Sequence, residues 1–431
     1  MIIADAALEK REREGAPIRV GIVGAGYIAR GIVSQLLKPP VGIRLAAISN
    51  RTLSRAETVL RDCGLDQFSI GSSVSEVESQ ISRGRVSVTD DPSLLCDASN
   101  VDVIIEATSD MEYGAKVVLG AIEGGKHVVL LNAALDSTVG PFLKLLADRK
   151  NVVITYTDGE EPGVAMNLFR FVKTIGYKPV GAGNIKGLLD HYRNPDTQKA
   201  FAARIKASPL MVTSFADGTK LAMECTILAN STGLRVGRRG MYGPTCAHVN
   251  EICHLLPQDQ LLNGGLVDFV LGAQPHTGAF VIGYNENPIN KEYMNAFKMG
   301  DGPFYVFYTP YHLPQLQINH TIARAALFHD PTTAPIGKPV CEVLSVAKRD
   351  LSGGEVLDGI GGFACYGLIE NSDVAQSQRA LPMGLSEGCR LKHSIKVDQI
   401  ITYDDVLIPT GRLCDKLRAE QDQYFSSTVT V

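Results

Sequence analysis

The chain has 431 residues, of which 45% are hydrophobic and 20% charged, a composition typical of a globular protein with two or three domains. The net charge of −4, from 42 Lys plus Arg against 46 Asp plus Glu, gives no long-range attraction for nucleic acid or an anionic membrane. The apolar runs fall far short of the roughly 20 residues that cross a bilayer, so we expect a small-molecule substrate as partner, and neither nucleic acid nor a membrane.

The first 157 residues alternate between strand-like and helix-like patterns. An apolar run at 18–23 enters a glycine turn, and helical spacing follows to residue 37. Further strands are predicted at 45–49, 85–88, 101–106, 127–131 and 152–157, and further helices at 54–61, 93–98, 111–120 and 137–148. The polar stretch 63–82 is interpreted as an insertion. Because parallel strands need crossover helices, the alternation predicts an α/β Rossmann domain, with a doubly wound parallel sheet, in residues 1–157.

Two further regions follow. Residues 158–330 are predicted to form a central α/β domain, with strands at 179–184 and 210–215 and helices at 162–175, 198–207 and 316–327. A further helix, which ends at residue 230, is predicted after a turn at Asp217-Gly218. Three prolines between residues 331 and 339 indicate a linker. Short strand signals at 343–346 and 395–403, with glycine turns between them, predict a small β-rich domain in residues 331–431.

The glycine turn matches the dinucleotide-binding pattern G-x-G-x-x-A, because it follows a strand and opens a helix. Gly24 permits the tight turn, Gly26 lets the backbone approach a pyrophosphate, and Ala29 lets the helix pack on the strand. Tyr27 and Ile28 lie in the same turn, so the anion would meet the N–H groups of this helix start. The alternative is a purely structural turn.

The end of the second strand discriminates between the two nicotinamide cofactors. An acid there would bind the ribose 2′-OH of NAD, but this chain has Asn50 and Arg51. An arginine is able to pair with a 2′-phosphate, so the sequence favours NADP over NAD. The alternative is that Arg51 is a solvated residue at a helix start.

Polar residues also follow two later strands of the predicted sheet. Ala107 and Thr108 end the strand at 101–106, and Asn132 ends the strand at 127–131. Ligands of open α/β sheets lie outside the carboxyl ends of the strands, so we expect these residues beside the ribose and nicotinamide. Ordinary turn chemistry is the alternative.

Charged residues of the central region are candidates for the substrate site. Reduction of a carbonyl needs a cation or proton donor where negative charge develops on oxygen, and Lys186, predicted on a loop after a strand, is the candidate. Asp190 follows closely, and Glu161 stands in a carboxylate cluster with Asp158 and Glu160. The carboxylates permit a divalent metal but do not require one, and no metal ligands are assigned. Each residue taken alone is as well explained as a solvated loop charge.

Cysteine and histidine give weaker signals. Nine cysteines without regular spacing favour reduced thiols and a cytoplasmic location over a disulfide framework. Cys246, His248, Cys253 and His254 match no regular zinc spacing and lie in an amphipathic pattern, so zinc is disfavoured. His312, after Tyr311, precedes a helix and is a candidate for lining the cleft or for packing.

Several of these stretches resemble a known family. Those that resemble the homoserine dehydrogenase-like superfamily are Gly24-Ala25-Gly26, Glu106-Ala107-Thr108, Asn132 and Asp217-Gly218-Thr219-Lys220. Residues 347–351 and Gly354-Glu355 resemble a SAF (β-clip) domain. The combination of the homoserine dehydrogenase-like stretches with the SAF-like region, together with Pro310-Tyr311-His312-Leu313, is similar to the deoxyxylulose-5-phosphate reductoisomerase-like (DRL) proteins. This resemblance implies NADPH, a central catalytic and dimerisation domain and hence a homo-oligomer, either dimer or tetramer.

One position departs from the family pattern. Homoserine dehydrogenases carry a catalytic lysine directly after the asparagine that matches Asn132, and this chain has Ala133 there. Homoserine is therefore not expected as substrate. The resemblance implies an NADP-dependent oxidoreductase of a small ketose, sugar phosphate or polyol, with conversion of 1-deoxy-D-xylulose 5-phosphate to 2-C-methyl-D-erythritol 4-phosphate the most specific expectation. A dehydrogenase or oxidoisomerase of a sugar acid, and a non-catalytic NADP sensor, are the alternatives.

Overall fold

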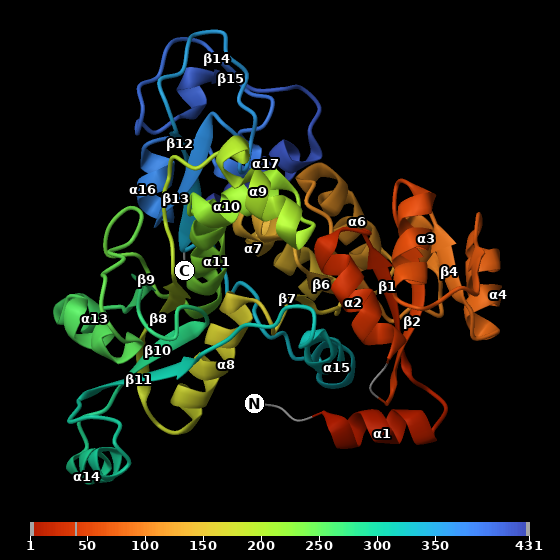
Figure 1. Cartoon of the computed structure of the whole chain (residues 1–431), viewed down its shortest axis with the longest axis horizontal. Coiled ribbons are helices and arrows are strands. Elements are labelled where there is room, and N and C mark those ends of the chain that lie inside the picture. Colours follow the sequence, from red (N-terminus) through yellow and green to blue (C-terminus); the bar gives the residue numbers. More distant parts are fainter. Residues whose placement is uncertain (1–3, 39–40, 428–431) are drawn as a thin grey trace. The chain divides into compact units, whose positions relative to one another are not determined.

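Figure 1 shows a computed structural model of the chain, which describes residues 4–38 and 41–427. The chain forms two compact units. The first consists of Met1–Glu160, Leu313–Ala334 and Arg412–Val431, and the second of Glu161–His312 and Pro335–Gly411. The three-domain division at residues 157 and 330 stays a prediction.

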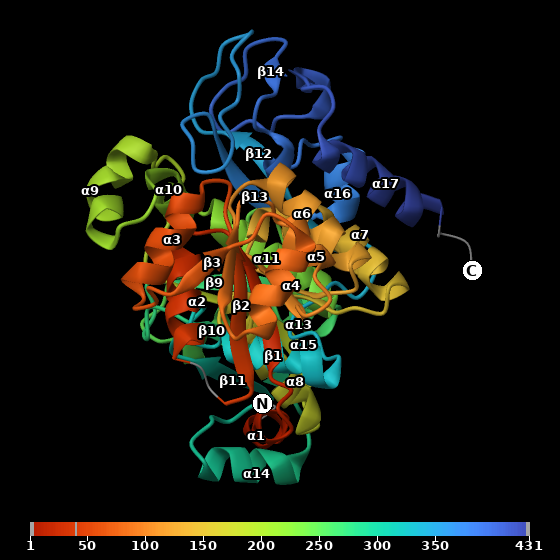
Figure 2. The same cartoon turned by 90° about the vertical axis from the view of Figure 1, so that its right-hand side faces the viewer.

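The first unit is built on a seven-stranded sheet in the order β3-β4-β2-β1-β5-β6-β7, and every pairing in it is parallel. Its strands are β1 (Ile18–Val23), β2 (Ile43–Ser49), β3 (Phe68–Ile70), β4 (Val86–Thr89), β5 (Val103–Glu106), β6 (His127–Leu130) and β7 (Ile154–Tyr156). The predicted doubly wound parallel sheet is therefore confirmed. The unit's N-terminal part is drawn in red to orange in Figures 1 and 2.

The first unit contains nine described helices, of which α2 to α7 connect successive strands of the sheet. They are α1 (Asp5–Arg13), α2 (Tyr27–Leu37), α3 (Leu53–Asp62), α4 (Val74–Ser82), α5 (Ser93–Asp97), α6 (Met111–Glu123), α7 (Ala133–Arg149), α15 (Ile318–Phe328) and α17 (Leu413–Ser427). The apolar side chains of β1 are fully buried and pack in one core with Ile32 and Val33 of α2 and Ile322 of α15. This burial fixes the point where β1 ends and the glycine turn begins.

The polar stretch 63–82 is part of the sheet, so its interpretation as an insertion was wrong. It contains β3, which pairs with β4, and α4, whose start is capped by the Ser73 hydroxyl, which accepts a hydrogen bond from the Glu76 N–H. The stretch is polar because β3 is an edge strand, on which Ile70 stays exposed. A half-exposed edge strand gives only a weak apolar signal.

The second unit is built on a four-stranded sheet in the order β11-β10-β8-β9. Strand β8 (Lys178–Lys186) runs parallel to β9 (Leu266–Leu271) and antiparallel to β10 (Ala279–Tyr284), which pairs with β11 (Phe304–Thr309). The helices of this unit are α8 (Glu161–Thr174), α9 (Pro195–Ile205), α10 (Pro209–Ala216), α11 (Thr219–Thr232), α12 (Ile252–Leu255), α13 (Gln258–Leu262), α14 (Pro288–Ala296) and α16 (Ser372–Ser377). A buried core joins the sheet to α12 and α13.

The predicted strand at 210–215 is wrong, because these residues form helix α10. Pro209 occupies its first turn, where the fixed backbone angle of proline suits a helix. The Thr213 hydroxyl donates to the Pro209 carbonyl at 2.8 Å, the bond that a threonine makes to the carbonyl four residues earlier within a helix. The apolar run was ambiguous, since periodicity does not separate a short buried helix from a strand.

The last part of the second unit holds two small antiparallel pairs. β12 (Cys341–Ala347) pairs with β13 (Cys365–Asn371), and β14 (Arg390–Leu391) with β15 (Val406–Leu407). The predicted strand at 395–403 is wrong: residues 395 and 400 make only isolated bridges. Asp398, with φ of 64°, lies between them and breaks the extended backbone. The SAF assignment stays a prediction.

Helix α17 had no counterpart among the predicted elements. In the first unit, the Glu112 carboxylate accepts hydrogen bonds of 2.8 Å from the N–H groups of both Leu413 and Cys414, at the start of this helix. A carboxylate in that position satisfies free helix N–H groups and complements the helix dipole. No described helix combines the length and apolar character needed to cross a bilayer.

Candidate active site

The glycine turn has the geometry that a dinucleotide-binding loop needs. Gly24 has φ of 116°, and a Cβ on it would lie 2.7 Å from the Ala107 carbonyl oxygen, so only glycine fits. Gly26 precedes the first residue of α2, and a Cβ there would meet no atom within 4 Å. The start of α2, where Tyr27 and Ile28 lie, therefore leaves space beside Gly26, as the approach of an anion to the helix N–H groups requires.

Strand β2 ends without a carboxylate. Arg51 has 65% of its side chain exposed, and its guanidinium lies 3.4 Å from Asp110 and 5.0 Å from the centre of the Tyr113 ring. The Asn50 side chain instead donates to the Thr52 carbonyl at 2.9 Å. An exposed guanidinium held by one weak ion pair is able to turn towards an anion.

A buried carboxylate organises the ends of β5 and β6. Glu106 accepts hydrogen bonds from the N–H and hydroxyl of Thr108, the former at 2.9 Å. Asn132 accepts from the Leu135 N–H at 3.1 Å, which caps α7. Burial raises the pKa of Glu106 to about 7, although the hydrogen bonds of Thr108 and Asn132 oppose that shift. The sequence analysis included Glu106 in a stretch that resembles the superfamily but did not assign it to the site.

Together these features fit a nicotinamide dinucleotide. The turn after β1 suits the pyrophosphate, the end of β2 suits the adenosine ribose, and the polar residues after β5 and β6 suit the nicotinamide half. Ala107, Thr108 and Asn132 thus lie at strand ends within the first unit, as predicted. Their individual contacts with the cofactor stay predictions.

The second unit brings together two of the three predicted catalytic residues. Lys186 is the last residue of β8, paired with Leu271 of β9, rather than a loop residue as predicted. Its ammonium lies 2.5 Å from a carboxylate oxygen of Glu161, the first residue of α8. The Glu161 side chain is 4% exposed and that of Lys186 is 23% exposed.

A second buried carboxylate completes the cluster. Glu224 of α11 has no exposed side-chain area and lies 3.5 Å from the Lys186 ammonium and 3.2 Å from the Lys220 ammonium. Asn184 donates to the same carboxylate at 3.0 Å. Lys220 and Glu224 share a face of α11 because they are four residues apart. Sequence reasoning did not assign Glu224, which was visible only as an acid that interrupts an apolar run.

The ion pairs determine the charges in this cluster. Burial by itself lowers the pKa of Lys186, but the carboxylates of Glu161 and Glu224 outweigh burial and raise it above its usual range. Burial likewise raises the pKa of Glu161, but the neighbouring cations, Lys186 first among them, outweigh burial and lower it. Lys186 is therefore a permanent cation at neutral pH, and Glu161 a permanent anion.

The third predicted catalytic residue lies apart from the cluster. Asp190 pairs with Arg193 at 2.9 Å and accepts a hydrogen bond from the Tyr192 N–H. Within the described residues, no ion pair or hydrogen bond joins Asp190 to Lys186 or Glu161. In the first unit, Asp158 pairs with Arg324 at 2.8 Å, so its carboxylate is committed to a buried structural contact.

Two carboxylates of the second unit lie close enough together to be considered as metal ligands. Oxygens of Glu161 and Glu224 lie within 4.8 Å of each other, but both carboxylates already face lysine ammonium groups, which would repel a second cation. Among the described residues, Cys246 and His248 belong to no metal-ligand cluster. His248 instead accepts from the Asn250 N–H at 3.2 Å. All nine cysteines are free thiols.

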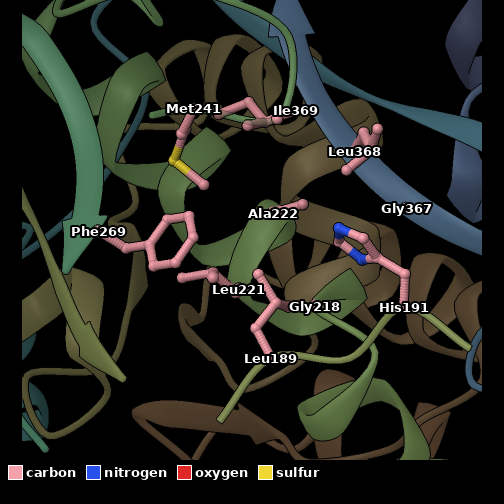
Figure 3. A pocket seen from close by; sticks show the side chains of 11 residues that line it. Leu189, His191, Gly218, Leu221, Ala222, Met241, Phe269, Gly367, Leu368 and Ile369 are labelled. Carbon is pink, nitrogen blue, oxygen red and sulfur yellow. The ribbon is translucent and has the colours of Figure 1, made fainter. Parts of the chain in front are cut away.

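A small hollow lies beside α11 (Figure 3). Apolar side chains, among them Leu221, Met241 and Phe269, form most of its lining, and His191 borders it. The His191 ring nitrogen Nδ1 lies 2.7 Å from the Asp217 carbonyl oxygen, so it is committed to the backbone. The hollow therefore lacks the charged groups that distinguish the Lys186 cluster.

Comparison with known families matches two stretches of the chain to oxidoreductase domains. Residues 24–156 match the NAD-binding domain of homoserine dehydrogenase, and residues 159–318 match the catalytic domain of oxidoreductase DRL. Homoserine dehydrogenase of Methylobacillus glycogenes is 31% identical over 119 residues, 28% of this chain and 26% of that protein. The Neisseria gonorrhoeae enzyme is 27% identical over 148 residues, 34% of this chain and 31% of that protein. The matches thus cover less than a third of either relative.

Solved structures give lower similarity. A homoserine dehydrogenase from Thiobacillus denitrificans is 17% identical, with a TM-score of 0.44, over 73% of this chain and 74% of that one. A probable dehydrogenase from Thermotoga maritima is 12% identical, with a TM-score of 0.42, over 74% of this chain and 91% of that one. The two domain matches carry the assignment: the chain combines a dinucleotide-binding domain of the homoserine dehydrogenase type with an oxidoreductase catalytic domain of the DRL type.

Proposed function

We propose that this oxidoreductase uses NADPH to reduce the carbonyl group of a small ketose or sugar phosphate, with reductoisomerisation of 1-deoxy-D-xylulose 5-phosphate as its specific reaction. The observation that supports the proposal is the ammonium of Lys186, held between two buried carboxylates and still 23% exposed. Such a fixed cation suits a reaction in which negative charge develops on a substrate oxygen.

The chain's own residues would stabilise that oxygen. A bound reduced nicotinamide supplies the hydride for the carbonyl carbon. The Lys186 ammonium faces the oxygen on which charge then develops, and Glu161 keeps the ammonium charged and fixed in direction. A reductoisomerase rearranges the carbon skeleton before reduction, so it polarises two neighbouring oxygens, and a cluster with several donors suits that requirement. Asp190 has no part in this proposal, because its carboxylate pairs with Arg193.

We further propose NADP as the preferred cofactor. Arg51, at the end of β2, offers an exposed guanidinium to a 2′-phosphate, and no carboxylate ends that strand to repel one. NAD would lose this charge-assisted contact.

Turnover of a panel of carbonyl compounds tests the proposal. NADPH oxidation is followed with 1-deoxy-D-xylulose 5-phosphate, other ketose phosphates and sugar acids, each at matched concentration. The proposal requires NADPH oxidation with a ketose phosphate and formation of 2-C-methyl-D-erythritol 4-phosphate from the first compound. Turnover of sugar acids alone would favour an oxidoisomerase, and NADPH binding without any turnover would favour a sensor.

A further inference from the structure

His312 lies at the Lys186 cluster, although neither the family matches nor the proposed function assigns it a role. It follows β11 in the sequence, and 30% of its side chain is exposed. Its Nε2 atom lies 3.7 Å from the oxygen of Glu161 that Lys186 does not contact. The Glu161 carboxylate thus has the Lys186 ammonium at one oxygen and the His312 ring at the other.

Thr277 holds the other ring nitrogen of His312. The Thr277 hydroxyl lies 3.1 Å from Nδ1. The Glu161 carboxylate is negative, and its charge favours a proton on the ring nitrogen nearest to it, so Nε2 carries the hydrogen in the neutral ring. Nδ1 is then an acceptor, and the Thr277 hydroxyl donates to it. The two contacts together select the Nε2–H form of a neutral His312 ring.

His312 and Lys186 each have an N–H donor that is not used in the contacts with Glu161 and Glu224. A separation of 3.7 Å is too long for a hydrogen bond, so the His312 Nε2–H is not committed to Glu161. The Lys186 ammonium has three N–H donors, and two of them suffice for Glu161 and Glu224. Each group therefore keeps a donor for an oxygen of a ligand.

We infer that His312 is a specificity-determining residue that donates its Nε2–H to one oxygen of the substrate while Lys186 binds the neighbouring oxygen. The substrate class that fits two donors around one carboxylate is an α-hydroxy carbonyl compound, whose hydroxyl and carbonyl oxygens are on adjacent carbons. This inference rests on the proposed function, because it adds a second donor to the same site. Thr277 is a positioning residue that acts through the His312 ring.

The charged groups around His312 support a donor role. Glu161 of α8 faces its Nε2, whereas the Lys186 ammonium in β8 contacts the other oxygen of Glu161 and the Lys220 ammonium in α11 contacts Glu224. Thr277, on the segment between β9 and β10, contributes no charge. The charged group nearest to the Nε2–H is thus the negative Glu161 carboxylate, which favours an orientation of this donor towards the Lys186 cluster.

Two ketones of matched size and three variants test the donor role. Hydroxyacetone carries the vicinal hydroxyl, and butan-2-one replaces that hydroxyl by a methyl group. His312→Ala removes the donor, His312→Gln keeps an N–H near the position of Nε2, and Thr277→Val removes the hydroxyl that fixes the ring. The ratio of kcat/KM for the two ketones is measured with NADPH. We expect the preference of the unchanged protein for hydroxyacetone to fall about tenfold in His312→Ala, the effect of one hydrogen bond, and to persist in His312→Gln.

A measurement without substrate separates this inference from the proposed function. The ¹⁵N spectrum of the imidazole nitrogens, assigned through the signal lost in His312→Gln, reports the ring form. We expect the Nε2–H form in the unchanged protein and a mixture of forms in Thr277→Val. An Nδ1–H ring in the unchanged protein, or an unaltered preference in His312→Ala, would overturn the inference. If the unchanged protein has the Nε2–H ring but reduces neither ketone nor any ketose phosphate, the proposed function fails and the donor role fails with it.

Discussion

The Lys186 ammonium lies 2.5 Å from a carboxylate oxygen of Glu161, although the two residues are 25 positions apart and belong to a strand and a helix. The strand end fixes the position of Lys186, and the helix start fixes that of Glu161. A pair anchored on two regular elements loses little side-chain freedom when a ligand binds. Its geometry is therefore prepared before substrate arrives, which is what electrostatic stabilisation of an oxyanion requires.

Glu224 is expected to stabilise the second unit through its ion pairs. Replacing Glu224 by Ala leaves the Lys186 ammonium with one carboxylate fewer and the Asn184 amide without its acceptor. We expect a loss of about 1–3 kcal/mol in the free energy of unfolding, because a partly buried cation and a buried donor lose partners. Glu224→Gln, which keeps an acceptor for Asn184, should lose less.

Chemical denaturation measures the effect of these variants. Glu123→Gln is the matched control, since Glu123 pairs with Lys150 on the surface with 70% of its side chain exposed. The control should change stability by at most about 1 kcal/mol. Equal losses for Glu224→Ala and the control would show that the buried ion pairs do not support the fold.

Arg51 is expected to discriminate between the two nicotinamide cofactors. Arg51→Ala should weaken NADP binding by about 1.5–3 kcal/mol, the size of a charge-assisted contact, and leave NAD binding nearly unchanged. Calorimetric titration with each cofactor measures this, with the exposed Arg83 replaced by Ala as control. Equal affinities for NADP and NAD in the unchanged protein would refute the cofactor preference.

Homoserine should not be a substrate. Ala133, the first residue of α7, stands where homoserine dehydrogenases carry a lysine, and its methyl group neither binds nor deprotonates a hydroxyl. We expect no NADP reduction above background with homoserine under conditions that support carbonyl reduction. Robust homoserine oxidation by the purified protein would show that another group of the chain replaces that lysine.

The stability of the first unit should decrease as pH rises, in part because of Glu106. Burial raises the pKa of Glu106 from 4.5 to about 7, so the folded state holds its proton more tightly than the unfolded chain. The stabilisation is fully present below pH 4.5, falls as pH rises, and is lost above about pH 7, a difference of about 3 kcal/mol. Glu106→Gln should remove this part of the pH dependence.

Unfolding at about pH 5 and about pH 8 tests the role of Glu106. Asp136 is the comparison, because burial alone raises its pKa to about 7 as well. Asp136→Asn should remove a separate part of the pH dependence, and the double variant should show the flattest profile. A pH dependence that Glu106→Gln leaves unchanged would mean that Glu106 stays ionised in the folded protein.

The elements with a clear local signal were predictable from the sequence. The apolar run at 18–23, the glycine turn and the helix after it follow from patterns within about 20 residues, and the structure confirms each. The apolar run at 210–215 could not be assigned in this way, because a short apolar run fits a strand as well as a helix, and Pro209 in the first turn of α10 favours the helix. The edge strand β3 was hidden because half-exposed strands need few apolar residues.

The Lys186 cluster was predictable only in part, because its contacts depend on the packing of elements that are distant in the sequence. Lys186 and Glu161 were each recognisable as charged residues next to apolar elements, but their contact depends on how β8 and α8 pack. Glu224 looked like a break in an apolar run, although it is buried because two ammonium groups compensate its charge. Asp190 is close in sequence to Lys186 but pairs with Arg193. Proximity in sequence therefore did not predict which charged groups contact Lys186, and the catalytic role of Asp190 stays a prediction.

The central claim is that the Lys186 ammonium stabilises the substrate oxygen and does not bind the cofactor. Lys186→Met keeps the apolar length of the side chain and removes its charge, and Lys199→Ala, on the exposed face of α9, is the control. The decisive measurement is kcat/KM for 1-deoxy-D-xylulose 5-phosphate with NADPH, alongside the dissociation constant of NADPH. We predict a fall of about 10² or more in kcat/KM for Lys186→Met with NADPH affinity nearly intact. Near-normal turnover, or a joint loss of NADPH binding and turnover, would contradict the claim.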